Sequence, residues 1–241
     1  MHCALDEPGI YHPVKQSVLE PDDLAAGVGR ALERMTTKAA MQRLRADYPW
    51  PNKPPSVPLD FANGWLDAST AGLLASSLSP DTSLVVEMGS WLGLSTRFIA
   101  ERAPRANVVA IDHWRGSAEH VASPECAAML PALYDTFLAN CWHHRERIYP
   151  LRMPTLDGLR VLHGRGLKPD VAYVDADHSY DGVAGDLRCL LSCFPETTIV
   201  GDDWNQFPSV RQAVTDVAAS FGVRVETSGN AYRIQGRRRG K

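Results

Sequence analysis

The stretch VVEMGSWLGLS at residues 85–95 decides the fold. It is an apolar run that ends in the acid Glu87 and is followed by two glycines, Gly89 and Gly93. Open α/β sheets bind their ligands where a strand stops at such a turn and the chain restarts as a helix. The stretch therefore predicts a strand, a ligand-binding turn and a helix, and the rest of the chain must indicate which ligand is held.

Apolar runs and helical stretches alternate through the rest of the chain. Strands are expected at 83–88, 107–111, 147–151, 170–175, 197–201, 223–227 and 231–235. Helical stretches separate the first six strands, whereas only SGN joins the last two, which is too short for a crossover helix. The pattern predicts an α/β fold: a seven-stranded, mostly parallel sheet with a C-terminal antiparallel hairpin.

Composition favours a small-molecule partner. With 241 residues, a net charge of -3 and a pI of about 6.2, the chain lacks the basic field of nucleic-acid-binding proteins. Its five cysteines have no CxxC spacing, which argues against a zinc site or a disulfide framework. We find no export signal and no apolar run of about 18 residues, so we expect a cytoplasmic protein with no membrane partner.

Residues 1–60 are expected to form an extension of the main domain at 61–241. Residues 21–47 place apolar side chains at helical spacing, and the proline-rich stretch 48–58 forbids regular structure. The apolar stripe of such a helix must be buried. It predicts either a lid over the acceptor site or a contact within a homodimer.

The glycine turn does not suit a phosphate. Trp91 stands where a dinucleotide-binding turn has its second glycine, and neither the P-loop pattern nor the serine-hydrolase G-x-S-x-G pattern is present. A zwitterionic ligand fits better. Glu87 can pair with an ammonium group, while the N–H groups of residues 90–93 and the hydroxyl of Ser95 suit a carboxylate at a helix N-terminus.

A second acid points to a ribose. Asp112 ends the next strand, 23 residues after Gly89, where an acid accepts hydrogen bonds from both ribose hydroxyls. For Asp112 alone, a helix cap is the simpler role. Together with the glycine turn and the terminal hairpin, it indicates S-adenosylmethionine, which has a ribose and an amino-acid end.

From Leu84 to Gln235 the chain resembles class I S-adenosylmethionine-dependent methyltransferases. The motifs IDHWRGSAEH, LYDTFLANCW, VDADHSYDGVAGDL and IVGDDW are similar to those of a bacterial branch that includes metal-dependent sugar and natural-product O-methyltransferases. The resemblance implies a Rossmann-like class I methyltransferase fold. It also implies cofactor contacts at Glu87, Gly89, Ser90, Gly93, Ser95 and Asp112, with Thr155 near the adenine.

Three further acids lie at expected strand ends. Asp175 follows the fourth strand, and Asp202 and Asp203 follow the fifth, so all three are expected at the same edge of the sheet. Oxygen ligands of this kind suit Mg²⁺, and binding to a cation lowers the pKa of a hydroxyl oxygen by several units. The alternative is that these acids are helix caps or surface charges. The sequence favours a metal site made of the three aspartates.

His178 follows Asp175 by three residues. It is a candidate base or orienting group, and a purely structural histidine remains an alternative. With Asp175 and His178 as catalytic residues, we expect an O-methyltransferase, assisted by Mg²⁺, that acts on a hydroxyl of a glycoside or other natural product. The alternatives are a metal-independent methyltransferase of nitrogen or phenols and a non-catalytic S-adenosylmethionine-binding protein. A dehydrogenase ranks last because Trp91 obstructs the pyrophosphate path.

Overall fold

The computed structural model describes residues 35–236 and divides the chain into two units, 1–39 and 40–241. Residues 35–47 are helical, and residues 48–67 have no helix or strand, as the prolines predict. Residues 21–34 of the expected amphipathic helix lie outside the described part. Whether the extension is a lid or a dimer contact therefore stays a prediction.

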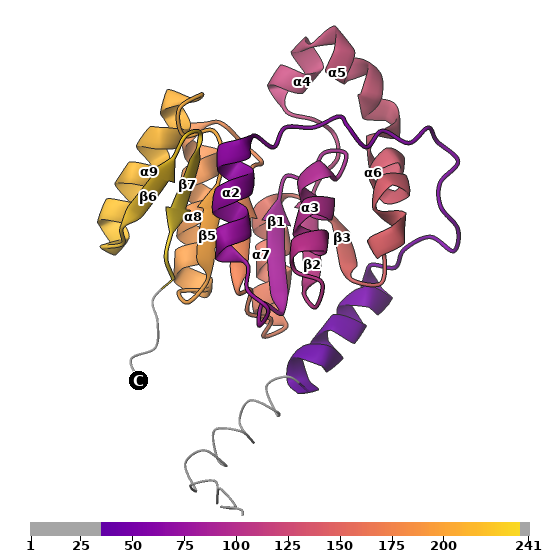
Figure 1. The fold of residues 1–241 in the computed structure, drawn as a ribbon, viewed down its shortest axis with the longest axis horizontal. Helices are drawn as coiled ribbons and strands as arrows, with labels where there is room; N and C mark the ends of the chain where they lie inside the picture. Colours follow the sequence, from indigo (N-terminus) through magenta and orange to yellow (C-terminus); the bar gives the residue numbers. More distant parts are fainter. Residues whose placement is uncertain (1–34, 237–241) are drawn as a thin grey trace, which may run out of the picture. The chain divides into compact units, whose positions relative to one another are not determined.

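Seven strands form one sheet, drawn in Figure 1. They are β1 (Leu84–Met88), β2 (Asn107–Asp112), β3 (Ile148–Arg152), β4 (Val171–Val174), β5 (Thr198–Gly201), β6 (Val225–Ser228) and β7 (Ala231–Ile234). Their order is β3-β2-β1-β4-β5-β7-β6, and β7 runs antiparallel to both of its neighbours, β5 and β6. The predicted sheet and terminal hairpin are confirmed.

Helices cover both faces of this sheet. They are α2 (Ala68–Ser77), α3 (Leu94–Arg102), α4 (Ala118–Ala122), α5 (Pro124–Met129), α6 (Leu133–Cys141), α7 (Thr155–Gly164), α8 (Tyr180–Cys193) and α9 (Pro208–Phe221), with the short 3₁₀ helices η1 (Leu130–Ala132) and η2 (Trp142–His144). One apolar cluster joins the sheet to α2, α3 and α6, and the other joins it to α7, α8 and α9. The domain therefore has three layers.

The alternation of side chains along each strand accounts for the two clusters. In β2, Val108 and Ala110 belong to the cluster on the α3 side, while Val109 and Ile111 belong to the opposite one. All four are fully buried. A parallel strand covered on both faces needs apolar residues at every position, which is why these strands read as continuous apolar runs in the sequence.

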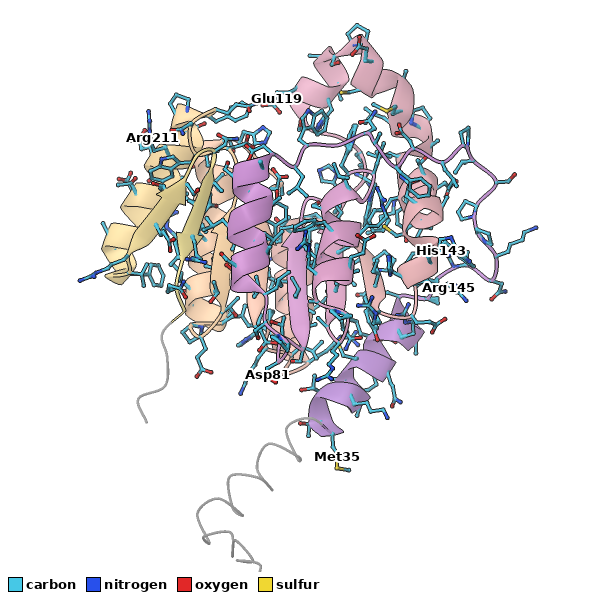
Figure 2. All side chains as sticks on the ribbon, in the orientation of Figure 1. Met35, Asp81, Glu119, His143, Arg145 and Arg211 are labelled. Atoms are coloured by element: carbon cyan, nitrogen blue, oxygen red, sulfur yellow. The ribbon has the colours of Figure 1, made fainter. Side chains whose placement is uncertain are left out.

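The parallel strands bring their carboxyl ends to one edge of the sheet. The chain leaves β2 at this edge and forms α4 and α5 there, in the upper part of Figure 1. Figure 2 shows Glu119 of α4 at this edge, whereas Asp81, just before β1, lies at the opposite one. This arrangement gathers the predicted site residues at a single edge.

The start of the second unit packs at the other end of the sheet. Ala40, Met41 and Leu44 are buried in the apolar cluster of α7, α8 and α9. The indole of Trp50 donates a hydrogen bond to the carbonyl of Ile148, where β3 begins, at 2.8 Å. In the described residues, no helix is both long and apolar enough to cross a membrane.

Candidate active site

The glycine turn brings the ends of β1 and β4 together. Gly89 has φ +83°, and a Cβ atom there would lie 2.0 Å from the carbonyl oxygen of Asp175. Glycine is required at this position, because any side chain would both strain the backbone and collide with the end of β4. The predicted cofactor-binding turn and the predicted catalytic aspartate are therefore neighbours.

Glu87 lies under this turn and is fully buried. Its Oε2 accepts hydrogen bonds from Ser90 Oγ, at 2.7 Å, and from Thr96 Oγ1. Its Oε1 accepts none from the described residues. Burial raises the pKa of Glu87 to about 7, against the lowering effect of the hydroxyls of Ser95, Thr96 and Ser90. An orphaned carboxylate oxygen of this kind can accept a hydrogen bond from a bound ammonium group.

Asp112 ties the tip of β2 to the same turn. Its Oδ2 accepts from the backbone N–H groups of Ser90, at 3.0 Å, and Trp91, at 3.1 Å, and its Oδ1 accepts from that of Trp114, at 2.6 Å. The Gly93 N–H donates to the carbonyl of Ser90 at 2.7 Å. The sequence predicted that the N–H groups of residues 90–93 bind a carboxylate of the ligand. Three of them instead donate hydrogen bonds to groups of the chain itself.

Trp91 adopts a backbone conformation that tryptophan rarely takes. Its φ is +47°, in the left-handed region that costs a bulky residue about 1 kcal/mol or more. The buried indole of Trp114 donates to the Trp91 carbonyl at 2.9 Å, and the Trp91 indole donates to Asn63 Oδ1 at 3.4 Å. These contacts hold the Trp91 ring in one place beside the turn.

Thr155 begins α7, directly after β3. Its hydroxyl donates a hydrogen bond to Oδ1 of Asp186 at 2.7 Å, which links α7 to α8. Asp186 is buried, and burial raises its pKa to about 6. The contact with adenine expected for Thr155 stays a prediction.

The acid cluster lies at the ends of β4 and β5. Asp175 Oδ2 accepts a hydrogen bond from the hydroxyl of the buried Tyr173 at 3.0 Å. Burial and the nearby charges of Asp202 and Asp203 raise the pKa of Asp175 to about 8. Burial is the larger cause of this rise, and the neighbouring carboxylates add to it.

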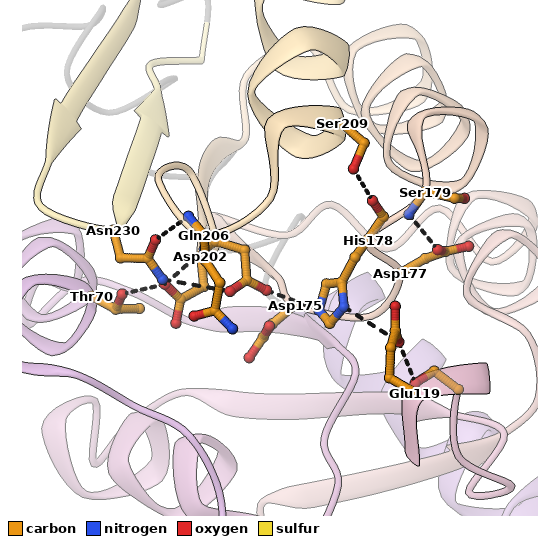
Figure 3. Close-up of polar contacts among 12 residues, drawn as sticks. Thr70, Glu119, Asp175, Asp177, His178, Ser179, Asp202, Gln206, Ser209 and Asn230 are labelled. Atoms are coloured by element: carbon orange, nitrogen blue, oxygen red, sulfur yellow. Dashed lines mark hydrogen bonds and ion pairs between the residues drawn. The ribbon is translucent and has the colours of Figure 1, made fainter. Parts of the chain in front are cut away.

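His178 and Asp203 face each other across this cluster. Asp203 has φ +69°, and its Oδ2 lies 2.9 Å from Nε2 of His178. The imidazole ring stacks on Phe207 with ring centroids 4.1 Å apart. Nδ1 of His178 makes no hydrogen bond within the described residues and lies 3.6 Å from Oε2 of Glu119 in α4. Figure 3 shows Glu119 and His178 pointing toward each other.

Asp202 has different partners. Its Oδ1 accepts hydrogen bonds from Thr70 Oγ1 at 2.8 Å, Asn230 Nδ2 at 3.0 Å and the Asp203 N–H at 2.8 Å, and the first two residues converge on it in Figure 3. These donors hold Asp202 in the structural framework of β5, α2 and the terminal hairpin.

Three side chains that each offer a possible metal-ligand atom come together here, namely Asp175, His178 and Asp203. One possible ligand atom from each lies within 4.8 Å of the others. Among residues 35–236, this is the one group of His, Cys, Asp and Glu side chains that could hold a metal ion. The sequence predicted Asp175, Asp202 and Asp203 instead. The left-handed turn at Asp203 directs its carboxylate toward His178, a backbone feature that spacing in the sequence does not show.

Several contacts at this edge were not predicted. Glu119, Thr70 and Asn230 reach the acid cluster from segments that are distant in sequence, and Trp65 packs against Trp91. The sequence offered one signal, because Glu119 belongs to the motif IDHWRGSAEH. The other residues belong to no recognisable motif.

The comparisons with known proteins agree with this geometry. Residues 86–204 match the family model described as a methyltransferase domain, and this match spans the predicted site residues from Glu87 to Asp203. No match was found among curated proteins.

Solved structures share the fold. An O-methyltransferase of Streptomyces achromogenes involved in tomaymycin synthesis, in complex with S-adenosylmethionine, matches 83% of this chain and 90% of its own, with a TM-score of 0.52 and 14% identity. A methyltransferase of Podospora anserina bound to S-adenosylhomocysteine matches 96% of this chain and 100% of its own, with a TM-score of 0.51 and 15% identity. The chain therefore contains a methyltransferase domain, built on a seven-stranded sheet with the fold of these S-adenosylmethionine-dependent methyltransferases.

Proposed function

We propose that this methyltransferase transfers a methyl group to a hydroxyl of a small molecule, a glycoside or another natural product, with the assistance of Mg²⁺. The observation that supports this most is the convergence of Asp175, His178 and Asp203 beside the cofactor-binding turn. A hydroxyl is a weak nucleophile, so its methylation requires groups that lower its pKa and accept its proton.

The acid cluster fits a divalent cation. Asp175 and Asp203 supply the carboxylate oxygens that Mg²⁺ prefers, and Mg²⁺ usually keeps water positions that an acceptor can replace. Burial and, after it, the charges of Asp202 and Asp203 raise the pKa of Asp175, and a bound cation would favour its ionised form. When bound, such a cation lowers the pKa of a hydroxyl oxygen by several units and fixes its position. Asp202 would support the site indirectly, because its Oδ1 accepts hydrogen bonds from Thr70 and Asn230.

Two residues are placed to accept the proton. Asp175 accepts one hydrogen bond, from Tyr173, and burial raises its pKa, which favours the form that holds a proton. His178 has one ring nitrogen against Asp203, and the nearby acids raise its pKa against the lowering effect of burial. Its other nitrogen lies near Glu119, which can hold the ring in a fixed orientation.

The cofactor would lie along the ends of β1 and β2. Glu87 offers a free buried oxygen to the ammonium group, and Asp112 retains acceptor capacity beyond its three backbone contacts, since a carboxylate has about four acceptor positions. The sulfonium supplies a good leaving group, so the chain must chiefly align the acceptor oxygen with the methyl group.

One observation favours a second candidate, a metal-independent methyltransferase of nitrogen or phenols. Glu119, His178 and Asp203 already form an acid–imidazole–acid arrangement, and such a histidine can act as a base without a metal. This reaction needs less activation, because amines and phenols are better nucleophiles than alcohols.

Methyl transfer in metal-stripped buffer separates the two candidates. A panel of hydroxylated natural products and glycosides is assayed with EDTA and again after Mg²⁺ is added back. We expect turnover only with Mg²⁺, while calorimetry shows S-adenosylmethionine binding under both conditions. Full turnover without any divalent ion would contradict the metal-assisted reaction and support the second candidate.

A further inference from the structure

A cavity lies near the start of β3, at the end of the sheet opposite the candidate active site. Its walls come from the stretch that follows the helix at 35–47 and from the turn before β3, all within the unit 40–241. Figure 2 shows Arg145 of this cavity well away from Glu119 of the site edge. The cavity volume is about 350 Å³, and the lining residues are Arg45, Pro49, Trp50, Pro51, Asn52, Trp142, Arg145 and Glu146. A cavity of this size can take a small organic molecule.

Two tryptophans give the cavity an aromatic lining. The rings of Trp50 and Trp142 meet edge to face, with centroids 5.8 Å apart and planes at 74°. The indole N–H of Trp50 donates a hydrogen bond to the carbonyl of Ile148 at 2.8 Å, which holds this ring against the start of β3. Both tryptophans are partly exposed. Their rings therefore offer apolar surface on which a flat ligand can stack, and little freedom is lost when it binds.

Two arginines bring positive charge to the same cavity. The guanidinium carbon of Arg45 lies 3.9 Å from the ring centroid of Tyr149, and this side chain donates to the carbonyl of Glu146 at 3.0 Å. The guanidinium carbon of Arg145 lies 4.9 Å from the ring centroid of Trp142, and its Nη1 donates to the carbonyl of Trp142 at 3.2 Å. A guanidinium has five N–H donors, so both groups keep donors for a ligand.

The charged groups of the lining favour a monoanion. The one carboxylate among the lining residues is that of Glu146, whose side chain is 83% exposed and whose Oε1 lies 3.5 Å from Nε of Arg145. Two guanidinium groups and one carboxylate give the lining a formal charge of +1, although the whole chain has -3. A carboxylate complements this charge, and its two oxygens match the planar fork of a guanidinium.

We propose that this cavity binds a small aromatic carboxylate. The carboxylate group lies at Arg45 and Arg145, and the flat ring lies against Trp50 and Trp142. The guanidinium donors account for the charge of the ligand, and the indole rings account for its flat apolar body. The cavity and the candidate active site lie at opposite ends of the sheet. This inference therefore does not depend on the proposed function.

A matched pair of ligands tests the charge. Naphthalene-2-carboxylate and naphthalene-2-carboxamide have nearly the same shape, and only the first is an anion at about pH 7. Calorimetry with the full chain should give at least about tenfold tighter binding of the carboxylate. Arg145→Gln removes one guanidinium and keeps a long polar side chain, so this preference should fall to about threefold or less.

Arg152→Gln is the matched control. Arg152 lies at the other end of β3, and its guanidinium carbon lies 4.7 Å from the ring centroid of Tyr134. This contact is of the same kind as that between Arg145 and Trp142, but it lies outside the cavity. Arg152→Gln should therefore keep the preference for the carboxylate. An equal loss of preference in both arginine variants would contradict the proposal.

Trp142→Ala tests the ring. The change removes one aromatic wall of the cavity, so both naphthalene ligands should bind at least about fivefold more weakly. Thermal unfolding checks that the variant remains folded. Unchanged affinity for both ligands in the folded variant would overturn the placement of the ring.

Other outcomes identify a different occupant. Loss of carboxylate binding at saturating S-adenosylhomocysteine would place the ligand in the cofactor site and overturn the proposal. A fall in native mass when the carboxylate is added, as light scattering would show, would mean that a second copy of the chain occupies the cavity. That result, an unchanged preference in Arg145→Gln, or no binding of the carboxylate by the unaltered chain would also overturn it.

Discussion

The carboxylates in the two halves of the site have different kinds of partner. In the cofactor half, at the ends of β1 and β2, Glu87 and Asp112 accept hydrogen bonds from hydroxyl and backbone groups of the same chain. In the acceptor half, at the ends of β4 and β5, Asp175 and Asp203 lie near each other. His178, just before α8, contacts Asp203.

The difference indicates what each half requires. The hydrogen bonds of the cofactor half fix the turn before any ligand binds, which lowers the ordering cost of binding. The acceptor half holds Asp175, His178 and Asp203 close together, and burial with the nearby acids raises the pKa of Asp175 to about 8; groups with shifted pKa values cluster at functional sites. We therefore expect changes in the first half to act on cofactor affinity and changes in the second to act on turnover.

The largest effect is expected in the acceptor half. Asp203→Asn removes a negative charge from the cluster and weakens the contact with His178, so methyl transfer should fall by about 100-fold or more. S-adenosylmethionine affinity should stay the same. The measurements are turnover at saturating cofactor and calorimetric titration of S-adenosylmethionine.

Asp202→Asn is the matched control. The amide oxygen can still accept hydrogen bonds from Thr70 and Asn230, so turnover should fall by less than about tenfold. A loss in Asp202→Asn as large as that in Asp203→Asn would show that Asp202 is a direct metal ligand, as the sequence pattern predicted.

The next effect concerns the cofactor half. Asp112→Ala removes the acceptor of the Ser90, Trp91 and Trp114 N–H groups as well as the expected ribose contact. Binding of S-adenosylmethionine should weaken by about 1.5–3 kcal/mol, roughly 10- to 150-fold. Calorimetry that finds undiminished affinity would exclude both ribose recognition and turn ordering as roles of this residue.

The smallest effect is a pH dependence. The pKa of Glu87 rises from 4.5 to about 7 on folding, chiefly through burial, so the folded chain binds this proton more tightly than the unfolded chain does. Its contribution to stability is fully present below pH 4.5 and is lost as the pH rises through about 7. As the pH rises from 4.5 to about 7, the free energy of unfolding of the unaltered chain should therefore fall relative to that of Glu87→Gln.

Cofactor affinity should follow the opposite direction. Ionised Glu87 pairs better with the ammonium group, so S-adenosylmethionine should bind more tightly as the pH rises through about 7. Denaturant titrations and calorimetry from pH 5 to 8 measure both trends. Identical pH slopes for Glu87→Gln and the unaltered chain would rule out this role for the carboxylate.

The sequence predicted the sheet well because its parallel strands are buried on both faces. Each apolar run became a strand within a few residues, and the short SGN connection correctly indicated the reversed β7. The glycine turn could also be predicted from the sequence. The backbone at Gly89 lies so close to that of Asp175 that there is no room for a side chain.

The ligand set of the acceptor half was harder to predict. Asp202 and Asp203 are adjacent in sequence, yet a left-handed residue and the donors Thr70 and Asn230 direct them to different partners. Glu119 reaches the site through the placement of α4. Such contacts depend on tertiary packing, and neither residue spacing nor periodicity encodes them.

The position of β7 has a consequence for how the chain folds during synthesis. This strand is made after both β5 and β6, yet it lies inside the sheet between them. Asn230, which precedes β7, also donates to Asp202. Because the ribosome releases the chain from its N-terminus onward, β1 and β2 can pair long before β7 is available. The nascent chain can thus pair β1 with β2 first, and the hydrogen bond from Asn230 to Asp202 can form only after the segment at β7 has been made.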